Sequence, residues 1–241
     1  MDGISYNRGD ASRLTEDIGG AITKVTEYMY TNFSTLKHQF EANWVGPDED
    51  AFMMKYLEGL KTVYENIYNV GETMSGFIIE AANTMVGFQN SLSSELGGYS
   101  ISNVSENRYA VNTNHNILDW PNWHQDYEEG VQLGLVTANS ETVLVDALDE
   151  YTTGVQNQIV EAMNAVQVGN AFVSSEEGAT NMGIQAFIEN VAESMKNLTK
   201  IVDSFKTETI PTLVAAFKSQ STTIASDSTD ASSSIESQIN G

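Results

Sequence analysis

Apolar side chains recur every three or four residues along the first part of the chain, the spacing of one face of an α-helix. From about Asp10 this stripe comprises Ile18, Ile22, Val25, Met29, Phe33, Leu36, Phe40 and Trp44. After an interruption it resumes with Leu60, Val63, Ile67, Val70, Met74, Phe77, Ala81, Met85, Phe88 and Leu92. The pattern predicts two long helices joined by a tight turn, and one stripe per helix needs a second hairpin to cover it.

The second half of the chain repeats this pattern. A stripe from Leu144 to Val166 lies 126 positions after the stripe from Ile18 to Phe40. Another, from Ile188 to Phe205, lies 128 positions after the stripe from Leu60 to Phe77. We therefore expect an all-α protein whose two long antiparallel helical hairpins form an intramolecular four-helix bundle.

The repeat places a second turn within Gly169–Ala179, about two residues longer than the first. A Ser-x-x-Glu pattern at Ser174–Glu177 fits a capping box at the start of the next helix. Depending on the alignment, Asn170 or Phe172 takes the position that Trp44 has in the first hairpin.

The first turn contains Trp44, then Gly46 and Pro47, and then the acidic run Asp48–Asp50. Gly46 can adopt a positive φ after a helix C-terminus. Pro47 suits a first helical position, and the acids suit the positive end of a helix dipole. Trp44 is expected to close this end of the hairpin as a large apolar plug.

A Trp-x-Gly turn between two uninterrupted helices, followed by Ala51 and Phe52, resembles the WXG100 (ESX) proteins of type VII secretion systems. The resemblance covers residues 10–93 and implies helical hairpins that pair into antiparallel four-helix bundles and are exported folded. It also implies a role for Trp44 and Gly46 in recognition by the secretion ATPase. A purely structural role as a hairpin cap is the alternative, and both roles can hold. The second half resembles the family in pattern only, with Phe172 as its degenerate counterpart of Trp44.

The stripes divide the chain into four parts. Residues 1–95 form the WXG100-like hairpin, and residues 142–225 form the degenerate second hairpin, which Pro211 should kink or split. Residues 96–141 form a connector that contains Trp120, Trp123 and Tyr127, and we interpret it as a packed cap, with an exposed binding patch as the alternative. The Ser-rich residues 226–241 predict a frayed or flexible tail.

Charge narrows the classes of partner. The 241 residues carry 11 basic and 33 acidic side chains, a formal net charge of −22, which argues against a nucleic-acid partner. Thirteen acids and no Lys or Arg lie between Arg108 and Lys196, which indicates a solvated anionic face or a docking surface for a basic partner. The absence of cysteine excludes thiol chemistry and disulfides. The first residues do not resemble a signal peptide, and no apolar run is long enough for a transmembrane helix.

The chain gives little sign of catalysis. His115, Asp119, His124 and Asp126 could meet at a metal, but their spacing matches no familiar site, so we expect no metal and no cofactor. His38 reads as a surface residue. Acid pairs such as those in Asp48–Asp50 read as helix N-terminal charge, and no phosphate loop or catalytic triad is visible. We therefore expect a protein that is not an enzyme.

By resemblance, the expected function is that of a type VII secretion substrate, or of an adaptor for a co-secreted effector, made in the cytoplasm of a Gram-positive bacterium. The family's Tyr-x-x-x-Asp/Glu export signal follows the second helix. Here the matches are Tyr6-x-x-x-Asp10, before the first helix, and Tyr68-x-x-x-Glu72, within the second, so Tyr68 and Glu72 are candidates that depart from the family's placement. A cytoplasmic targeting chaperone for a toxin, a membrane-active toxin and an unrelated helical scaffold are the alternatives. The assembly expected is a monomeric pseudo-dimer, or a homodimer.

Overall fold

The computed structural model describes residues 8–104, 127–177 and 181–240, without the side chains of 174–177, 181–183 and 235–240. Its elements in chain order are α1 (Arg8–Asn43), β1 (Trp44–Val45), α2 (Pro47–Glu95), β2 (Gly134–Leu135), α3 (Ser140–Glu177), α4 (Asn181–Ser204), a π-helical turn (Phe205–Thr209) and α5 (Ile210–Asn240). Helices α1 to α4 form one bundle, so the all-α fold expected from the stripes is confirmed.

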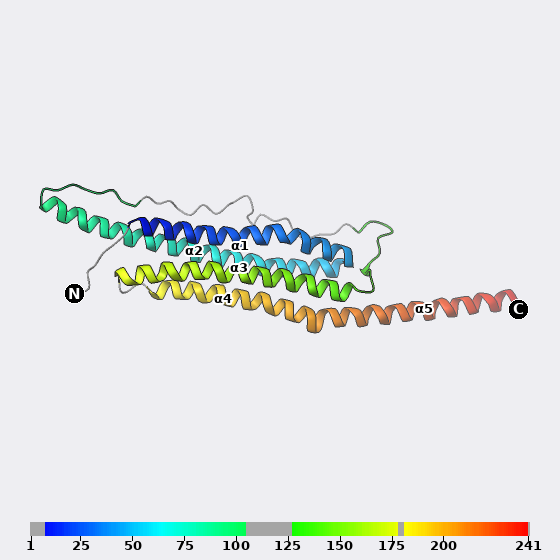
Figure 1. Ribbon diagram of the computed structural model, residues 1–241. Helices are drawn as coiled ribbons and strands as arrows, with labels where there is room; N and C mark the ends of the chain where they lie inside the picture. Colours follow the sequence, from blue (N-terminus) through cyan, green and yellow to red (C-terminus); the bar gives the residue numbers. More distant parts are fainter. Residues whose placement is uncertain (1–7, 105–126, 178–180, 241) are drawn as a thin grey trace.

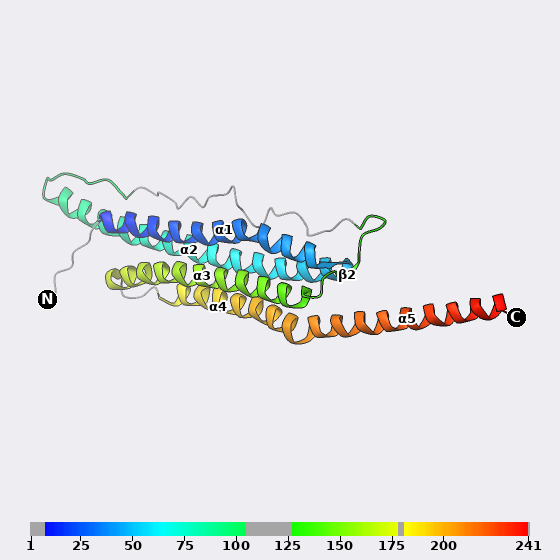
Figure 2. The same cartoon turned by 45° about the vertical axis from the view of Figure 1, so that its right-hand side comes forward.

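The two hairpins lie head to tail (Figures 1 and 2). Helix α1 runs antiparallel to both α2 and α3; its most extensive packing is against α3, while α2 packs against α4. The turn between α1 and α2 therefore lies at the end of the bundle where α3 begins and α4 ends. This arrangement places the Trp-Val-Gly turn against the second hairpin.

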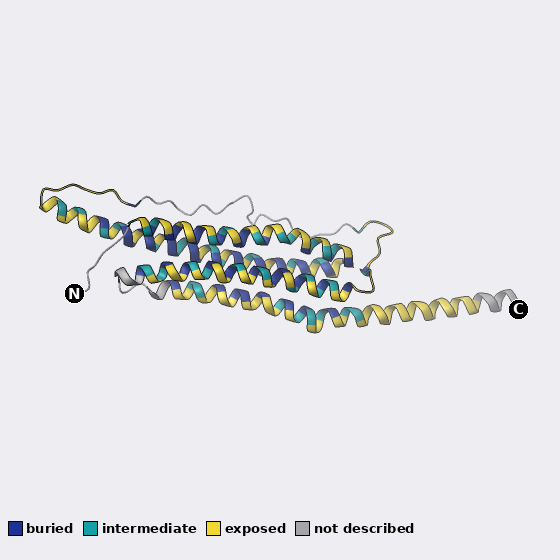
Figure 3. Ribbon diagram, in the orientation of Figure 1, coloured by how far each residue is buried: buried dark blue, intermediate teal, exposed yellow. Residues whose placement is uncertain are grey.

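The core consists of the predicted stripes, whose members are mostly buried (Figure 3). Two tyrosines are buried in the core, and the hydroxyl group of each forms a hydrogen bond. The Tyr151 hydroxyl donates to the Met29 carbonyl at 2.8 Å. The Thr152 hydroxyl donates to the Leu148 carbonyl, so the Tyr56 hydroxyl, 2.8 Å from Thr152 Oγ1, is the donor in that pair. Such bonds remove most of the cost of burying a phenol.

The expected position of the second turn is wrong. Helix α3 continues past Gly169 as far as Glu177, so Ser174 does not cap the next helix, and Phe172 lies within α3. Gly169 is buried, and a Cβ there would lie 2.8 Å from Ile78 Cδ1. Its small size allows α3 and α2 to pack closely. From the sequence alone, this glycine suggested the end of a helix.

Helix α2 extends beyond the other three helices (Figure 1). Phe88 and Leu92, which the stripe places in the core, are exposed on this overhang because no facing helix reaches them. The chain then turns at Gly97 and runs back along α2. The side-chain amide of Asn90 exchanges two hydrogen bonds with the backbone of Ile101 at 2.7 and 2.8 Å. Asn83 does the same with Val104 at 2.8 and 3.3 Å.

The break predicted at Pro211 is present as a π-helical turn followed by a change of direction between α4 and α5 (Figure 2). The Ile210 N–H donates to the Phe205 carbonyl, five residues back. Proline cannot donate a backbone bond and crowds the preceding turn, which explains the irregularity. Beyond it, α5 continues as a helix to Asn240, through the Ser-rich residues for which the sequence predicted a frayed or flexible tail.

No described helix combines the length with the apolar character that crossing a membrane requires. Trp120 and Trp123, which led us to expect a cap over the bundle, lie outside the described residues.

Candidate functional site

The Trp-Val-Gly turn is the strongest candidate site from the sequence, and its backbone departs from the expected form. Gly46 is extended, with φ 160° and ψ 163°, rather than left-handed. Pro47 opens α2, as expected. The carbonyl of Gly46 accepts bonds from the N–H groups of Glu49 and Asp50 at 3.0 and 3.2 Å. Glycine is needed here for space, because a Cβ would overlap the Asp48 carboxylate.

Asp48 occupies that space because it accepts a hydrogen bond from Trp44. The indole Nε1 lies 3.1 Å from Asp48 Oδ2. The carboxylate also lies in the first turn of α2, where the helix dipole favours negative charge. Trp44, Gly46 and Asp48 therefore form one unit: the glycine leaves room for the carboxylate that satisfies the indole.

The Trp44 ring is part of a buried aromatic cluster at this end of the bundle. Its members are Phe40, Trp44, Phe52 and Phe205, with ring centroids 4.4 to 6.4 Å apart. Trp44 is only 1% exposed, which fits the cap interpretation. Phe205 comes from the π-helical turn of the second hairpin, so the two hairpins close this end together.

The connector also contacts the turn, a contact that the sequence did not predict. Strand β1 pairs antiparallel with β2, Trp44 opposite Leu135, and the Val136 N–H donates to the Asn43 carbonyl at 3.1 Å. The Thr137 hydroxyl lies 3.1 Å from Asn43 Oδ1 and 2.9 Å from the Ser140 hydroxyl at the start of α3. Segments of two residues are too short to show apolar alternation, so no signal in the sequence marked this link.

The acidic run is partly enclosed by the same connector. The Tyr127 hydroxyl donates to Asp50 Oδ2 at 2.6 Å, while Glu49 is fully buried. Burial first, and then the bond to Asp50 and the charges of the neighbouring carboxylates, raise the pKa of the Tyr127 phenol above its ordinary value. Tyr127 therefore acts as a neutral donor that fixes the connector to the start of α2.

The other candidate residues lie away from this site. Phe172 is half-buried near the C-terminal end of α3. That end of α3 lies at the opposite end of the bundle (Figure 1). Tyr68 and Glu72 lie in the middle of α2, where burial and then the charge and hydrogen bond of Glu72 raise the pKa of Tyr68. His38 is exposed, and Tyr6 and the possible metal ligands His115, Asp119, His124 and Asp126 lie outside the described residues. Within the part of the chain that is described, no three metal-binding side chains come together.

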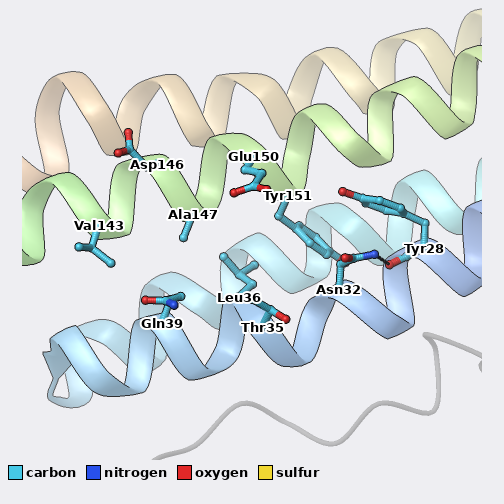
Figure 4. A pocket seen from close by; sticks show the side chains of 10 residues that line it. All are labelled: Tyr28, Asn32, Thr35, Leu36, Gln39, Val143, Asp146, Ala147, Glu150 and Tyr151. Atoms are coloured by element: carbon cyan, nitrogen blue, oxygen red, sulfur yellow. Dashed lines mark hydrogen bonds between the residues drawn. The ribbon is translucent and has the colours of Figure 1, made fainter.

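A groove of about 310 Å³ runs between α1 and α3 (Figure 4). Asp146 and Glu150, one helical turn apart, line its α3 side, and no Lys or Arg is among its lining residues. Tyr28 and Asn32 line the α1 side, where the Asn32 amide donates to the Tyr28 carbonyl at 3.0 Å. Burial, and then the charge of Glu150, raise the pKa of Tyr28. The groove has the charge to receive a basic side chain.

Comparison of the chain with protein-family models, with curated proteins and with solved structures found no match.

Proposed function

We propose that this protein is a non-enzymatic substrate or partner of a type VII secretion system, of the WXG100 kind, with two hairpins fused in one chain. It is made in the cytoplasm of a Gram-positive bacterium and leaves the cell folded, alone or with a co-secreted effector. Its partner is the secretion ATPase or that effector, and it needs no cofactor.

The observation that carries this proposal is the Trp-Val-Gly turn between two long helices, with the second hairpin packed head to tail against the first. Such a bundle is the assembly that the resemblance implies for two separate hairpins. If the secretion machinery recognises one Trp-x-Gly turn per bundle, a chain that contains both hairpins needs only one. This accounts for the absence of the motif from the second hairpin.

The buried indole refines how the turn would be recognised. At 1% exposure Trp44 offers almost no surface to a partner. The ATPase would therefore contact the surface that Trp44 shapes, namely the start of α2 with its exposed Asp48. The groove beside Asp146 and Glu150 is a second place for a basic partner segment.

Export from the native host tests the proposal. The tagged chain is expressed with and without the secretion ATPase, beside the variants Trp44→Ala and Phe205→Ala. We expect the wild type in the medium only when the ATPase is present, and we expect Trp44→Ala to remain in the cells. Phe205→Ala is the matched control, because it removes a ring of the same cluster outside the motif.

The two variants separate recognition from folding. If Phe205→Ala is exported and Trp44→Ala is not, the motif itself is recognised. If both are retained, export requires a well-packed bundle end rather than the motif. Retention of the wild type with the ATPase present contradicts export; copurification with a toxin would then favour a targeting chaperone, and its absence a helical scaffold.

A further inference from the structure

Helix α5 has neighbours only in its first turns, where Leu213 and Val214 pack against the core and the Phe217 ring lies beside Gly134 of β2. Among the described residues, nothing packs against the rest of the helix. From Phe217 to Ser234 its described side chains are exposed (Figure 3). Most of these residues are Ser, Thr, Asp and Ala. Isolated helices are marginal in water, and Ser, Thr and Asp are weak helix formers. A helix of this composition needs a surface to pack against.

One face of α5 is suited to such packing. Phe217, Ile224 and Ala231 recur every seven residues, with Ser221 and Ser228 between them on the same face. Ile224 is 59% exposed. The threonine hydroxyls at 222, 223 and 229 donate to backbone carbonyls four residues back, at 2.9 to 3.2 Å, which lowers the polarity of the helix surface.

An apolar groove of about 450 Å³ lies between α3 and α4. Ile159, Val160 and Met163 line it from α3, and Ile188, Val191, Ala192 and Met195 from α4. The repeat shows what is missing: Ala192 and Lys196 lie 128 positions after Tyr64 and Tyr68. In the first hairpin these positions carry two aromatic rings, 6.2 Å apart, that pack against the core.

We propose that α5 of a second copy of this chain fills the groove between α3 and α4, and that two copies exchange these helices about a two-fold axis.

The lengths agree with this arrangement. Ile224 lies 14 residues after Ile210, or about 21 Å along α5. Met195 and Ala192 lie 15 and 18 residues before Ile210, or about 22 and 27 Å back along α4. Helix α5 continues outward from α4, which lies at one edge of the bundle (Figure 2). With the two bends side by side, Ile224 of each copy therefore reaches the groove of the other. The two equivalent contacts form a closed two-fold dimer.

Charge favours this groove over other surfaces of a chain with a net charge of −22. None of its twelve lining residues is acidic, and one of them, Lys196, is basic. The Lys196 ammonium is already paired with Glu193 Oε2 at 3.2 Å, so the groove offers Asp227, one turn from Ile224, a nearly neutral surface rather than a free positive charge. A second copy can thus dock here although the two molecules repel each other as a whole.

The absence of cysteine allows a direct test by crosslinking. Chains carrying Ile224→Cys are mixed with chains carrying Ala192→Cys and oxidised. A matched mixture pairs Ile224→Cys with Lys24→Cys, an exposed site on α1. We expect a disulfide-linked dimer of the two different chains in the first mixture only. Equal yields in the two mixtures, or no product in either, would overturn the proposal.

Light scattering on the full chain at physiological ionic strength gives the second readout. We expect a wild-type dimer, and for Ile224→Asp an association weakened about 100-fold or more, because a charge replaces the side chain at the centre of the contact. Ser226→Asp adds the same charge to the opposite face of α5 and should leave the dimer intact. Unchanged melting of Ile224→Asp, compared with the wild type at a concentration at which both are monomeric, would show that the bundle is intact. A wild-type monomer at all concentrations, or open-ended oligomers, would refute the two-fold exchange.

Discussion

At the scale of single residues, the Trp-Val-Gly turn is a packing unit in which each member depends on another. Trp44 fills the end of the bundle, but its indole N–H needs an acceptor there. Asp48 supplies it at 3.1 Å, and Gly46 leaves the space in which the carboxylate lies. From the sequence we expected glycine at position 46 for its left-handed backbone. In the structure the backbone is extended, and glycine is needed because a Cβ would overlap the Asp48 carboxylate.

A double-mutant cycle tests this dependence. Gly46→Ala should lower the free energy of unfolding by about 1–3 kcal/mol, because the new methyl group displaces the Asp48 carboxylate from Trp44. In an Asp48→Ala background the same methyl group meets no carboxylate, so its cost should fall to well under half. Urea unfolding of the four proteins measures both values. Equal costs in the two backgrounds would show that Gly46 is needed for backbone conformation instead.

At the scale of elements, the stripes predicted helices well, because burial of one face is what stabilises them. Ile18, Leu60, Leu144 and Leu198 are all buried. The differences between expectation and structure at the second turn and at the C-terminal tail have a different cause. Glycine and threonine, which often interrupt helices, have another role at these positions. Gly169 brings two helices close together, and the threonines of α5 bond to their own helix. Neither use is visible without the neighbouring element.

The return segment Tyr99–Val104 illustrates a contact that no periodicity predicts. Asn90 and Asn83 lie seven residues apart on α2, or about 10.5 Å, and their partners Ile101 and Val104 lie three residues apart, or about 10 Å of extended chain. The two amides therefore bind the segment at matching positions, as strands of a sheet would.

We expect Asn90→Ala to release the first half of this segment. Hydrogen exchange of the Ile101 amide should become about 5- to 10-fold faster, because its acceptor at 2.7 Å is lost. Protection of Val104, held by Asn83, should change much less. Asn69→Ala, at an exposed asparagine of the same helix, is the control. Unchanged exchange at Ile101 would mean that other contacts hold the segment.

At the scale of the whole molecule, the sequence predicted the bundle but not what ties its first turn to the rest. The internal repeat gave the number of hairpins and their pairing, because each hairpin leaves one apolar face uncovered. The backbone pair β1–β2 and the side-chain bonds Asn43–Thr137 and Tyr127–Asp50 join residues 77 to 94 positions apart, and the connector residues of these pairs follow no periodic pattern. Candidate Trp44 was identified correctly as part of the closed end, while its partners Phe205 and Asp48 emerge only from the packing.

Because the aromatic cluster includes both hairpins, the molecule should unfold as a single cooperative unit. Phe40→Ala, in the first hairpin, and Phe205→Ala, in the second, should each lower the free energy of unfolding by about 3–5 kcal/mol and shift the same transition. Phe88→Ala, on the exposed overhang, is the control and should cost well under 1 kcal/mol, because its ring is 56% exposed. Urea titrations followed by circular dichroism and by tryptophan fluorescence should coincide for all three variants. Two separate transitions, of which Phe205→Ala moves only one, would instead show that each hairpin is stable by itself and that the cluster merely docks them.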